Sequence, residues 1–320
     1  MTTIPVLRGL HHVTAITGNA PANLDFYTRI LGMRLVKKTV NQDDVSAYHL
    51  FYADAIGSPG TDLTFFDWKQ MPQGLPGAGT VSETAFRIQG GTDSLNLWLR
   101  WFEAQGVSHG PMANTGQFPS IPFQDPEGQR LRLIAEPAGA DFNHFHPWRG
   151  SPVPLEAAIV GLGAVTLTVR DFEPAARFLT EILQFRVNSN DPGLFELGEG
   201  GLGARLHLHT SSSPGTAMAG GVHHVAWAVA NLDQQHAWLG RLAEYQVATS
   251  GLIDRFYFQS VYFRIPGGIL FEIATEGPGF TADGEEMDRL GEELSLPPFL
   301  EKRRVEIEAG LEPLESPKVS

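Results

Sequence analysis

The chain has 320 residues, of which 42% are hydrophobic and 18% are charged, and its formal net charge at pH 7 is −13. The length allows two ordinary domains with a sizeable core, and the negative charge argues against nucleic acid or an anionic membrane surface as a partner. Cysteine is absent, which excludes disulfides and thiolate metal sites, so any metal must be bound by histidine and carboxylate side chains.

Two modules are predicted in the first half of the chain, each with a strand, an amphipathic helix and further strands. The first begins with the strand 9–17 (GLHHVTAIT), and Gly32 is suited to end the helix that follows it. Its helix carries Leu24, Tyr27 and Leu31 at helical spacing. The second begins with 81–88 (VSETAFRI), and its helix carries Trp98, Leu99 and Phe102. The turn signal 125–128 (DPEG) predicts a hairpin near its end.

The second half repeats this order. The strand 161–169 (GLGAVTLTV) aligns with the first module's strand, and Asp171 is placed to cap the next helix, with Pro174 in its first turn. That helix carries Phe178, Leu179 and Ile182. The last module begins with 222–229 (VHHVAWAV), which aligns with the second module's strand, and it contains the turn signal 265–268 (IPGG). Its helix carries Trp238, Leu239 and Leu242.

These repeats predict an α+β fold of four strand–helix–strands modules in two halves. We place the N-terminal half at 1–145 and the C-terminal half at 156–280, joined by the proline-rich segment 145–158. The tail 281–320 is expected to pack on the body, because Leu300, Ile307 and Leu311 recur at near-helical spacing.

The repeat also works as an internal control, because it shows which residues the modules do not need in order to fold. His11 and His12 align with Gly163 and Ala164 of the third module. Aligned in the same way, His223 and His224 correspond to Ser82 and Glu83, and Glu272 corresponds to Arg132. A carboxylate within the apolar run GILFEIA is costly unless it is paired, hydrogen-bonded or bound to a metal. The two histidine pairs and Glu272 therefore predict a metal site.

Alternation of side chains along a strand selects one histidine from each pair. His224 shares a strand face with the small residues Ala226 and Ala228, which suit a face that curves around a cavity, and His12 is its counterpart. The predicted ligands are His12, His224 and Glu272. Two histidines and one carboxylate with open positions are typical of non-haem Fe(II), although Zn²⁺ and Ni²⁺ also accept these ligand types. If His12 meets His224, the first and fourth modules must lie side by side.

The first module offers no further carboxylate ligand. The position that matches Glu272 falls near Phe65 or Phe66, and neither side chain can bind a metal. One complete ligand set per chain is therefore expected.

Beyond these arguments, the sequence resembles the vicinal oxygen chelate superfamily, and within it the ring-cleaving dioxygenases that act on hydroquinones. The resemblance covers nearly the whole chain and is carried by LHHVTAIT, GGVHHVAWAV, DRFYFQSVYFRIPGGILFEIATEGPGF and the tail LGEELSLPPFLEKRRVEIEAGLEPL. It implies paired βαβββ modules around one Fe(II) per chain, bound by the second histidine of each pair and the glutamate of the last strand. Mn(II) and Zn(II) are the alternative metals.

The resemblance also implies a substrate pocket and a reaction. The pocket would be lined by His11, Thr14, His223, Arg255 and Tyr262. Arg255 would favour the phenolate form of the substrate, and His11, His223 and Tyr262 would be the acid–base and hydrogen-bonding groups. The partners would be a small aromatic diol and O₂, with no nucleic acid or membrane, and a homo-oligomer is left open. The N-terminus shows no secretory signal and no apolar run reaches 18 residues, so a cytoplasmic location is expected.

Three other functions stay open at this point. A lactoylglutathione lyase or another metal-dependent isomerase of the same fold would need a further carboxylate over the metal. A catechol-type extradiol dioxygenase would normally have its ligands within one half of the chain. A metal-free binding module of the bleomycin-resistance type would leave Glu272 and both histidine pairs unexplained.

Overall fold

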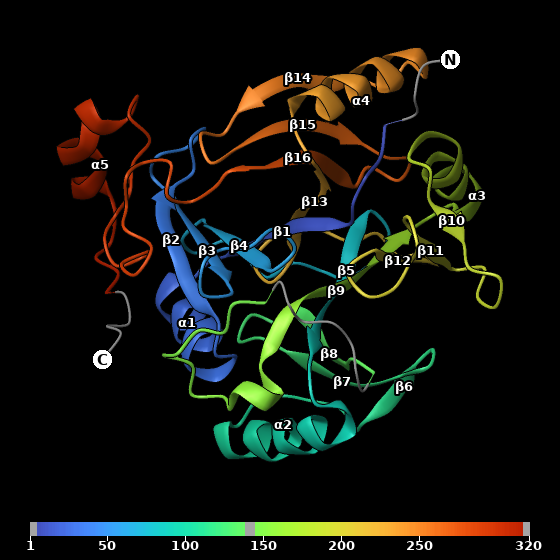
Figure 1. Ribbon diagram of the computed structural model, residues 1–320, viewed down its shortest axis with the longest axis horizontal. Coiled ribbons are helices and arrows are strands. Elements are labelled where there is room, and N and C mark those ends of the chain that lie inside the picture. Colours follow the sequence, from blue (N-terminus) through green and yellow to red (C-terminus); the bar gives the residue numbers. More distant parts are fainter. Residues whose placement is uncertain (1–4, 138–144, 316–320) are drawn as a thin grey trace.

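The computed structural model describes residues 5–137 and 145–315. Residues 1–4 and 138–144 of the predicted N-terminal half, and residues 316–320 of the predicted tail, lie outside these ranges. Two eight-stranded sheets form its framework (Figure 1). The strands of the first sheet are β1 (Leu10–Thr17), β2 (Arg34–Val40), β3 (Tyr48–Ala53), β4 (Asp62–Asp67), β13 (Val222–Val229), β14 (Thr249–Asp254), β15 (Phe258–Arg264) and β16 (Leu270–Pro278). Their order across the sheet is β14-β15-β16-β13-β1-β4-β3-β2.

The second sheet has the same plan and the order β10-β11-β12-β9-β5-β8-β7-β6. Its strands are β5 (Thr80–Ile88), β6 (Ala113–Thr115), β7 (Phe118–Gln124), β8 (Arg130–Ala135), β9 (Ile159–Val169), β10 (Arg186–Val187), β11 (Leu194–Glu196) and β12 (Arg205–Thr210). Each sheet therefore takes four strands from each half of the chain. The antiparallel pairing of β1 with β13 confirms that the first and fourth modules lie side by side.

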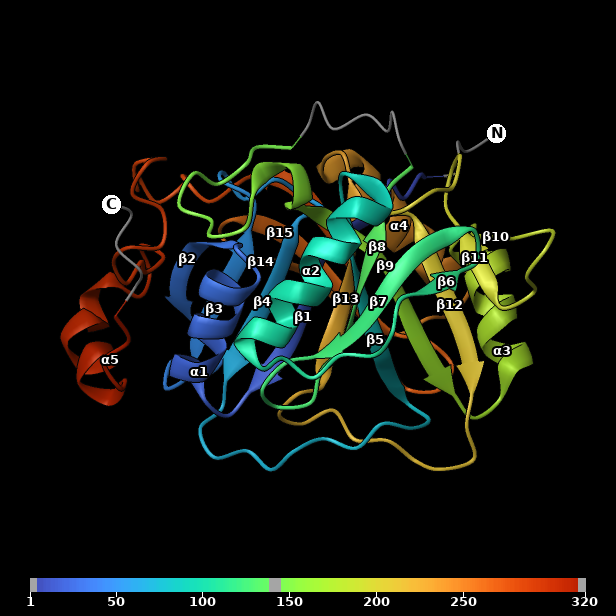
Figure 2. The same cartoon turned by 90° about the horizontal axis from the view of Figure 1, so that it is seen from below.

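Helices cover the outer sides of the sheets (Figures 1 and 2). The outer sides are covered by α1 (Ala20–Asp25), continued by the π-helical turn η1 (Phe26–Ile30), by α2 (Gly91–Gln105), by α3 (Phe172–Arg177), continued by the π-helical turn η3 (Phe178–Ile182), and by α4 (Leu232–Glu244). The remaining helical segments are α5 (Arg304–Gly310) and the short 3₁₀ turns η2 (Leu155–Ala157) and η4 (Glu301–Arg303). None of the helices in the described ranges is long and apolar enough to cross a membrane.

Local sequence signals explain where the first helix begins and ends. The Asn19 side chain caps α1 by accepting a hydrogen bond from the backbone of Ala22. Leu24, Tyr27 and Leu31 are buried, as the helical spacing predicts. Gly32 then follows with a φ of +71°, a left-handed conformation that glycine adopts without strain.

The third helix differs from its prediction in one respect. Asp171 occupies the N-cap position of α3, but its side chain makes no capping hydrogen bond. Pro174 stands three residues later and has no backbone N–H, so one of the two amides that usually bind a capping side chain is missing. The two turn signals do join antiparallel strands, 125–128 between β7 and β8 and 265–268 between β15 and β16.

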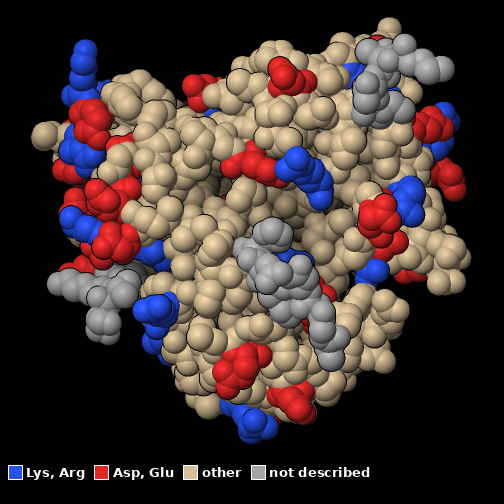
Figure 3. Space-filling view, in the orientation of Figure 1, with Lys and Arg blue, Asp and Glu red and all other residues tan. Residues whose placement is uncertain are grey.

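The C-terminal segment 281–315 runs along the edge of the first sheet, and both views place α5 at that edge, near β2 (Figures 1 and 2). Leu300, Ile307 and Leu311 are buried. The ammonium group of Lys37, on β2, is fully buried and binds carboxylates of Asp283, at 2.8 Å, and Glu285. Acidic and basic side chains crowd on this edge (Figure 3), where exposed ion pairs such as Arg304–Glu308 run along the segment.

Candidate metal centre

Three neighbouring strands bring the predicted ligands together. Glu272 lies on β16, His224 on β13 and His12 on β1, and these strands are adjacent in the first sheet. The Glu272 Oε2 atom is 3.0 Å from Nε2 of His224 and 3.3 Å from Nε2 of His12, and the two Nε2 atoms are 3.3 Å apart. All three side chains are buried. Among the residues that the structure describes, this is the one cluster of three or more such groups with metal-binding spacing.

The cluster fits a bound metal ion. Three donor atoms that lie 3.0–3.3 Å apart can share one ion at the usual bond lengths of about 2.0–2.2 Å. The buried Oε2 atom of Glu272 also has no hydrogen-bond partner of good geometry, which would be costly if it stayed unmatched. The predicted site bridging the first and fourth modules is thus confirmed as a geometric cluster.

Neighbouring side chains fix the orientation of each candidate ligand. Ser260 donates a hydrogen bond of 2.5 Å to the Oε1 atom of Glu272, which leaves Oε2 facing the cluster. The Nδ1 atoms of His11 and His12 are 2.8 Å apart, and the Nδ1 atoms of His223 and His224 are also 2.8 Å apart. Partners of this kind set the ring orientation and the tautomer of metal-binding histidines.

The electrostatics favour an ionised Glu272 and neutral imidazoles at His11, His223 and His224. Burial alone would raise the pKa of the Glu272 carboxyl, but His12 and His224 hold that pKa well below its usual range. Burial lowers the pKa of His224, against the opposing effect of Glu272. Burial and the adjacent histidine likewise lower the pKa of His11 and of His223 to about 3. Neutral imidazole and ionised carboxylate are the forms that bind metals.

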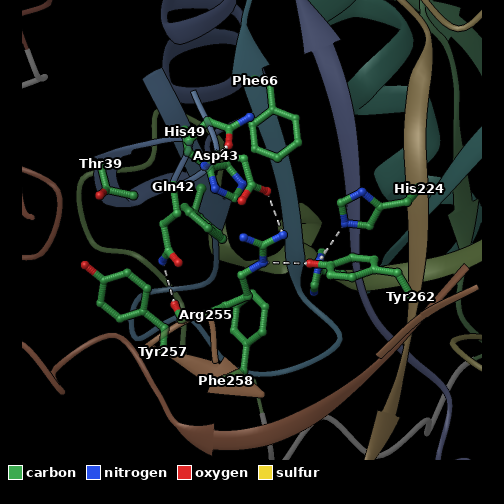
Figure 4. A pocket seen from close by; sticks show the side chains of 13 residues that line it. Thr39, Gln42, Asp43, His49, Phe66, His224, Arg255, Tyr257, Phe258 and Tyr262 are labelled. Carbon is green, nitrogen blue, oxygen red and sulfur yellow. Dashed lines mark hydrogen bonds and ion pairs between the residues drawn. The ribbon is translucent and has the colours of Figure 1, made fainter. Parts of the chain in front are cut away.

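A cavity of about 440 Å³, counting the part that is open to solvent, adjoins His12 and His224. Aromatic side chains form much of its wall, namely Phe51, Phe66, Tyr257, Phe258 and Tyr262. Its polar lining consists of Thr39, Asn41, Gln42, Asp43, His49 and Arg255 in addition to the two histidines (Figure 4).

Arg255 and Tyr262, both predicted from the sequence, line this cavity and contact each other. The Nε atom of Arg255 donates to the hydroxyl oxygen of Tyr262 at 3.2 Å, and its guanidinium lies over the same ring. Asp43 accepts a second hydrogen bond from Arg255, at 2.9 Å (Figure 4). Burial lowers the pKa of Arg255, but Asp43 and Tyr262 raise it on balance. Burial and then Glu272 raise the pKa of the Tyr262 hydroxyl, so it stays protonated.

The structure places the other predicted pocket residues differently. His11, Thr14 and His223 are not among the side chains that line the cavity. His11 and His223 contact the rings of His12 and His224 instead. The buried hydroxyl of Thr14 is 2.8 Å from that of Thr64 on β4. Their predicted roles toward the substrate stay predictions.

Several lining residues were missed by the sequence analysis, among them His49, Gln42 and Asp43. His49 lies on β3, whereas Gln42 and Asp43 lie in the loop between β2 and β3. Gln42 donates a hydrogen bond of 2.8 Å to the backbone oxygen of Arg255, so this loop meets the fourth module at the cavity. No repeat or motif singles out a loop residue, and the sequence around His49 (AYHLFY) shows only a histidine within an aromatic-rich strand.

The position that matches Glu272 in the first module is Thr64, which corrects the expectation of Phe65 or Phe66. Thr14 faces Thr64 across β1 and β4 with the same register as Ala226 and Glu272 across β13 and β16. The pairing shifts the match by one residue, which only the strand register can reveal. A threonine hydroxyl stands where an isomerase would need a further carboxylate.

The second sheet carries no equivalent cluster within the described residues. Glu83 and Arg132, which match His224 and Glu272, form a bidentate ion pair with N–O distances of 2.7 and 2.8 Å. Ala164 stands at the position of His12. On this face of the second sheet, an ion pair therefore occupies the place that the metal ligands have in the first sheet.

Comparisons with known proteins agree with this geometry. Residues 9–133 and 161–273 match the family model of the Glyoxalase/Bleomycin resistance protein/Dioxygenase superfamily. The "Putative ring-cleaving dioxygenase MhqA" of Bacillus subtilis is 41% identical over 97% of this chain and 99% of its own length. The "Chlorohydroquinone/hydroquinone 1,2-dioxygenase" of Sphingobium indicum is 33% identical over 92% of this chain and 93% of its own.

Among solved structures, a crystal structure titled as a "putative dioxygenase" from Bacillus subtilis superposes with a TM-score of 0.88 at 34% identity. The superposition covers 98% of this chain and all of that one. The family model spans well over half of the chain and reaches all three ligand-bearing strands of the first sheet, β1, β13 and β16. The chain therefore belongs to the Glyoxalase/Bleomycin resistance protein/Dioxygenase superfamily.

Proposed function

We propose that this protein is a ring-cleaving dioxygenase that uses Fe(II) bound by His12, His224 and Glu272 to open a hydroquinone-type ring with O₂. The observation that carries the proposal is the buried His–His–Glu cluster beside an aromatic-walled cavity. Relatives of nearly the same length are named for ring cleavage, and one of them for hydroquinone. Two histidines and one carboxylate leave open positions on iron, as oxygen chemistry requires.

Bound Fe(II) would supply the redox centre at which an electron-rich ring and O₂ come together. The chain's own residues would prepare the ring. The permanently charged Arg255 favours a phenolate over a phenol nearby. Tyr262 accepts a hydrogen bond from Arg255 and lines the cavity, so its hydroxyl would be a hydrogen-bonding group for the substrate. Phe66 and Phe258 line the cavity and limit the planes that a flat ring can adopt.

His11 and His223 would hold the ligand rings of His12 and His224 in place, through the contacts between Nδ1 atoms. We retain for both the predicted role in proton transfer as a proposal. Both residues lie next to a ligand and outside the lining of the cavity. A proton that passes between them and the reacting ring would therefore have to move through water or through another group of the substrate.

The test is O₂ uptake by protein that has been reconstituted with Fe(II) under anaerobic conditions, with hydroquinone and catechol as alternative substrates. We expect uptake with hydroquinone, loss of activity in air and recovery with Fe(II) plus ascorbate. Activity that is restored by Zn²⁺ without O₂ uptake would contradict the proposal and favour an isomerase. Protein that binds no metal would favour a binding module.

A further inference from the structure

His49 is a cavity residue with no role in the proposed function so far. Its Nε2 atom is 3.0 Å from the hydroxyl oxygen of Thr64, which is in turn 2.8 Å from the hydroxyl of Thr14. The ring lies between Phe51 and Phe66, with centroid distances of 3.9 and 4.4 Å. Five side chains of the first module thus form one fixed assembly in which the imidazole cannot turn without losing its contacts.

The other ring nitrogen of His49 is available to a ligand. Within residues 5–137 and 145–315, the Nδ1 atom has no hydrogen-bond partner, and the side chain lines the cavity (Figure 4). Burial, together with His12 and His224, lowers the pKa of His49 well below its usual value, so the ring is neutral. A neutral imidazole has one donor and one acceptor nitrogen. Because the Thr64 hydroxyl can donate or accept, Nδ1 can take either role toward a hydroxyl group.

His49 and the metal cluster lie apart across the strands of the first sheet. The ligands lie on β16, β13 and β1, whereas His49 lies on β3, two strands beyond β1. Adjacent strands are about 4.8 Å apart, so a ring lying between them has the metal at one end and His49 at the other. A 1,4-diol carries oxygen atoms at both of these ends. A 1,2-diol carries both at one end and would leave Nδ1 unmatched.

We propose that His49 binds the ring hydroxyl that points away from the metal, and that it thereby selects 1,4-diols over 1,2-diols. This inference rests on the proposed function and names its substrate-selecting residue. Thr64 is then a positioning residue, because it acts on the substrate only through the His49 ring. Its hydroxyl occupies the place where the fourth module has Glu272, so the first module uses this position for a diol-recognition contact.

Anaerobic binding to the Fe(II)-loaded protein tests the inference without relying on turnover. Hydroquinone is compared with 4-methylphenol, which has a similar shape and lacks the second hydroxyl. For the wild-type protein we expect hydroquinone to bind more tightly by roughly two- to tenfold, the usual net worth of one hydrogen bond. His49→Phe should abolish this preference and leave the affinity for 4-methylphenol nearly unchanged. His49→Gln, which keeps a donor and an acceptor, should retain part of it.

Thr64→Val is a second variant that keeps the imidazole and removes only its anchor, and it should weaken the preference less than His49→Phe does. His236→Phe, on the exposed face of α4, is the matched control and should behave like the wild type. A preference that survives in both His49→Phe and Thr64→Val would overturn the inference, as would a wild-type protein that binds the two phenols equally. A wild-type protein that binds neither phenol would overturn the proposed function itself.

Discussion

The Nδ1 atoms of His11 and His12 lie 2.8 Å apart, and this contact determines which nitrogen of His12 can bind a metal. The Nε2 atom of His11 is 3.1 Å from the backbone oxygen of Thr275, to which it must donate. Because the pKa of His11 is lowered to about 3, mainly by burial, its ring is neutral near pH 7 and Nδ1 is an acceptor. His12 therefore donates from Nδ1, and its Nε2 atom is the one that faces the cluster and can bind a metal.

This arrangement predicts that the three ligands and their supports behave differently when they are removed. His12→Ala, His224→Ala and Glu272→Ala should each purify nearly free of iron after anaerobic reconstitution, because two remaining ligands hold Fe(II) poorly. The measurement is metal content per chain, with His236→Ala as a control that should keep about one ion. Full iron content in His12→Ala would show that the ligand set is wrong.

The supporting residues should change affinity without abolishing binding. His11→Ala, His223→Ala and Ser260→Ala should each weaken metal binding by about 10–100-fold, the usual effect of removing a group that orients a ligand. Ser260→Ala is the cleanest of these, because it removes one hydrogen bond to Glu272 and little volume. Competition with a calibrated chelator measures the affinity. Unchanged affinity in all three variants would mean that the ligand side chains are held by packing alone.

The sequence predicted those residues of the site that differ from their counterparts in the internal repeat. His12, His224 and Glu272 stood out because equivalent strands fold without them, and alternation then chose one histidine of each pair. His49 and Asp43 gave no such signal, since their roles arise only where β3 and a loop meet the fourth module. The Thr64 position was missed by one residue because a strand register depends on pairing with another strand, which a repeat alignment does not contain.

The buried contact between Lys37 and Asp283 predicts a contribution of the C-terminal segment to stability. Asp283→Asn should lower the free energy of unfolding at pH 7 by about 1.5–3 kcal/mol, the usual contribution of a hydrogen bond to a charged group. The measurement is urea denaturation, with Tyr257→Phe as a control that removes a different side-chain hydrogen bond to Asp283 and keeps the ion pair. Equal stability of Asp283→Asn and wild type would show that the segment is not anchored by this contact.

The same contact predicts a pH dependence. Burial raises the pKa of Asp283, but the bond to Lys37 lowers it on balance below its usual value. A carboxyl with a lowered pKa stabilises the fold fully above its unfolded pKa of about 3.9, and this stabilisation is lost as the pH falls through the folded pKa. The difference between wild type and Asp283→Asn should therefore be constant from pH 7 to 5 and shrink below about pH 4. A difference that grows with acid would reverse the assigned sign.

The two sheets predict that a second metal site can be built where the chain now has an ion pair. Glu83, Arg132 and Ala164 occupy the positions of His224, Glu272 and His12. The strand registers support this match. In the second sheet Ala85 pairs with both Ala164 and Arg132, and in the first sheet Ala226 pairs with both His12 and Glu272. The combined variant Glu83→His, Arg132→Glu, Ala164→His should therefore bind two ions per chain, whereas we expect the wild-type protein to bind one.

Native mass spectrometry after anaerobic reconstitution gives the number of ions. The double variant Glu83→His, Arg132→Glu is the control, because it lacks the third ligand and should hold only the original ion firmly. Replacing Arg132 also removes its hydrogen bond to Ser120, in the double variant and in the combined variant alike. If the combined variant folds and binds only one ion, the strand positions of the two sheets are not equivalent. The Glu83–Arg132 pair would then not explain why the second sheet has no metal-binding cluster within the described residues.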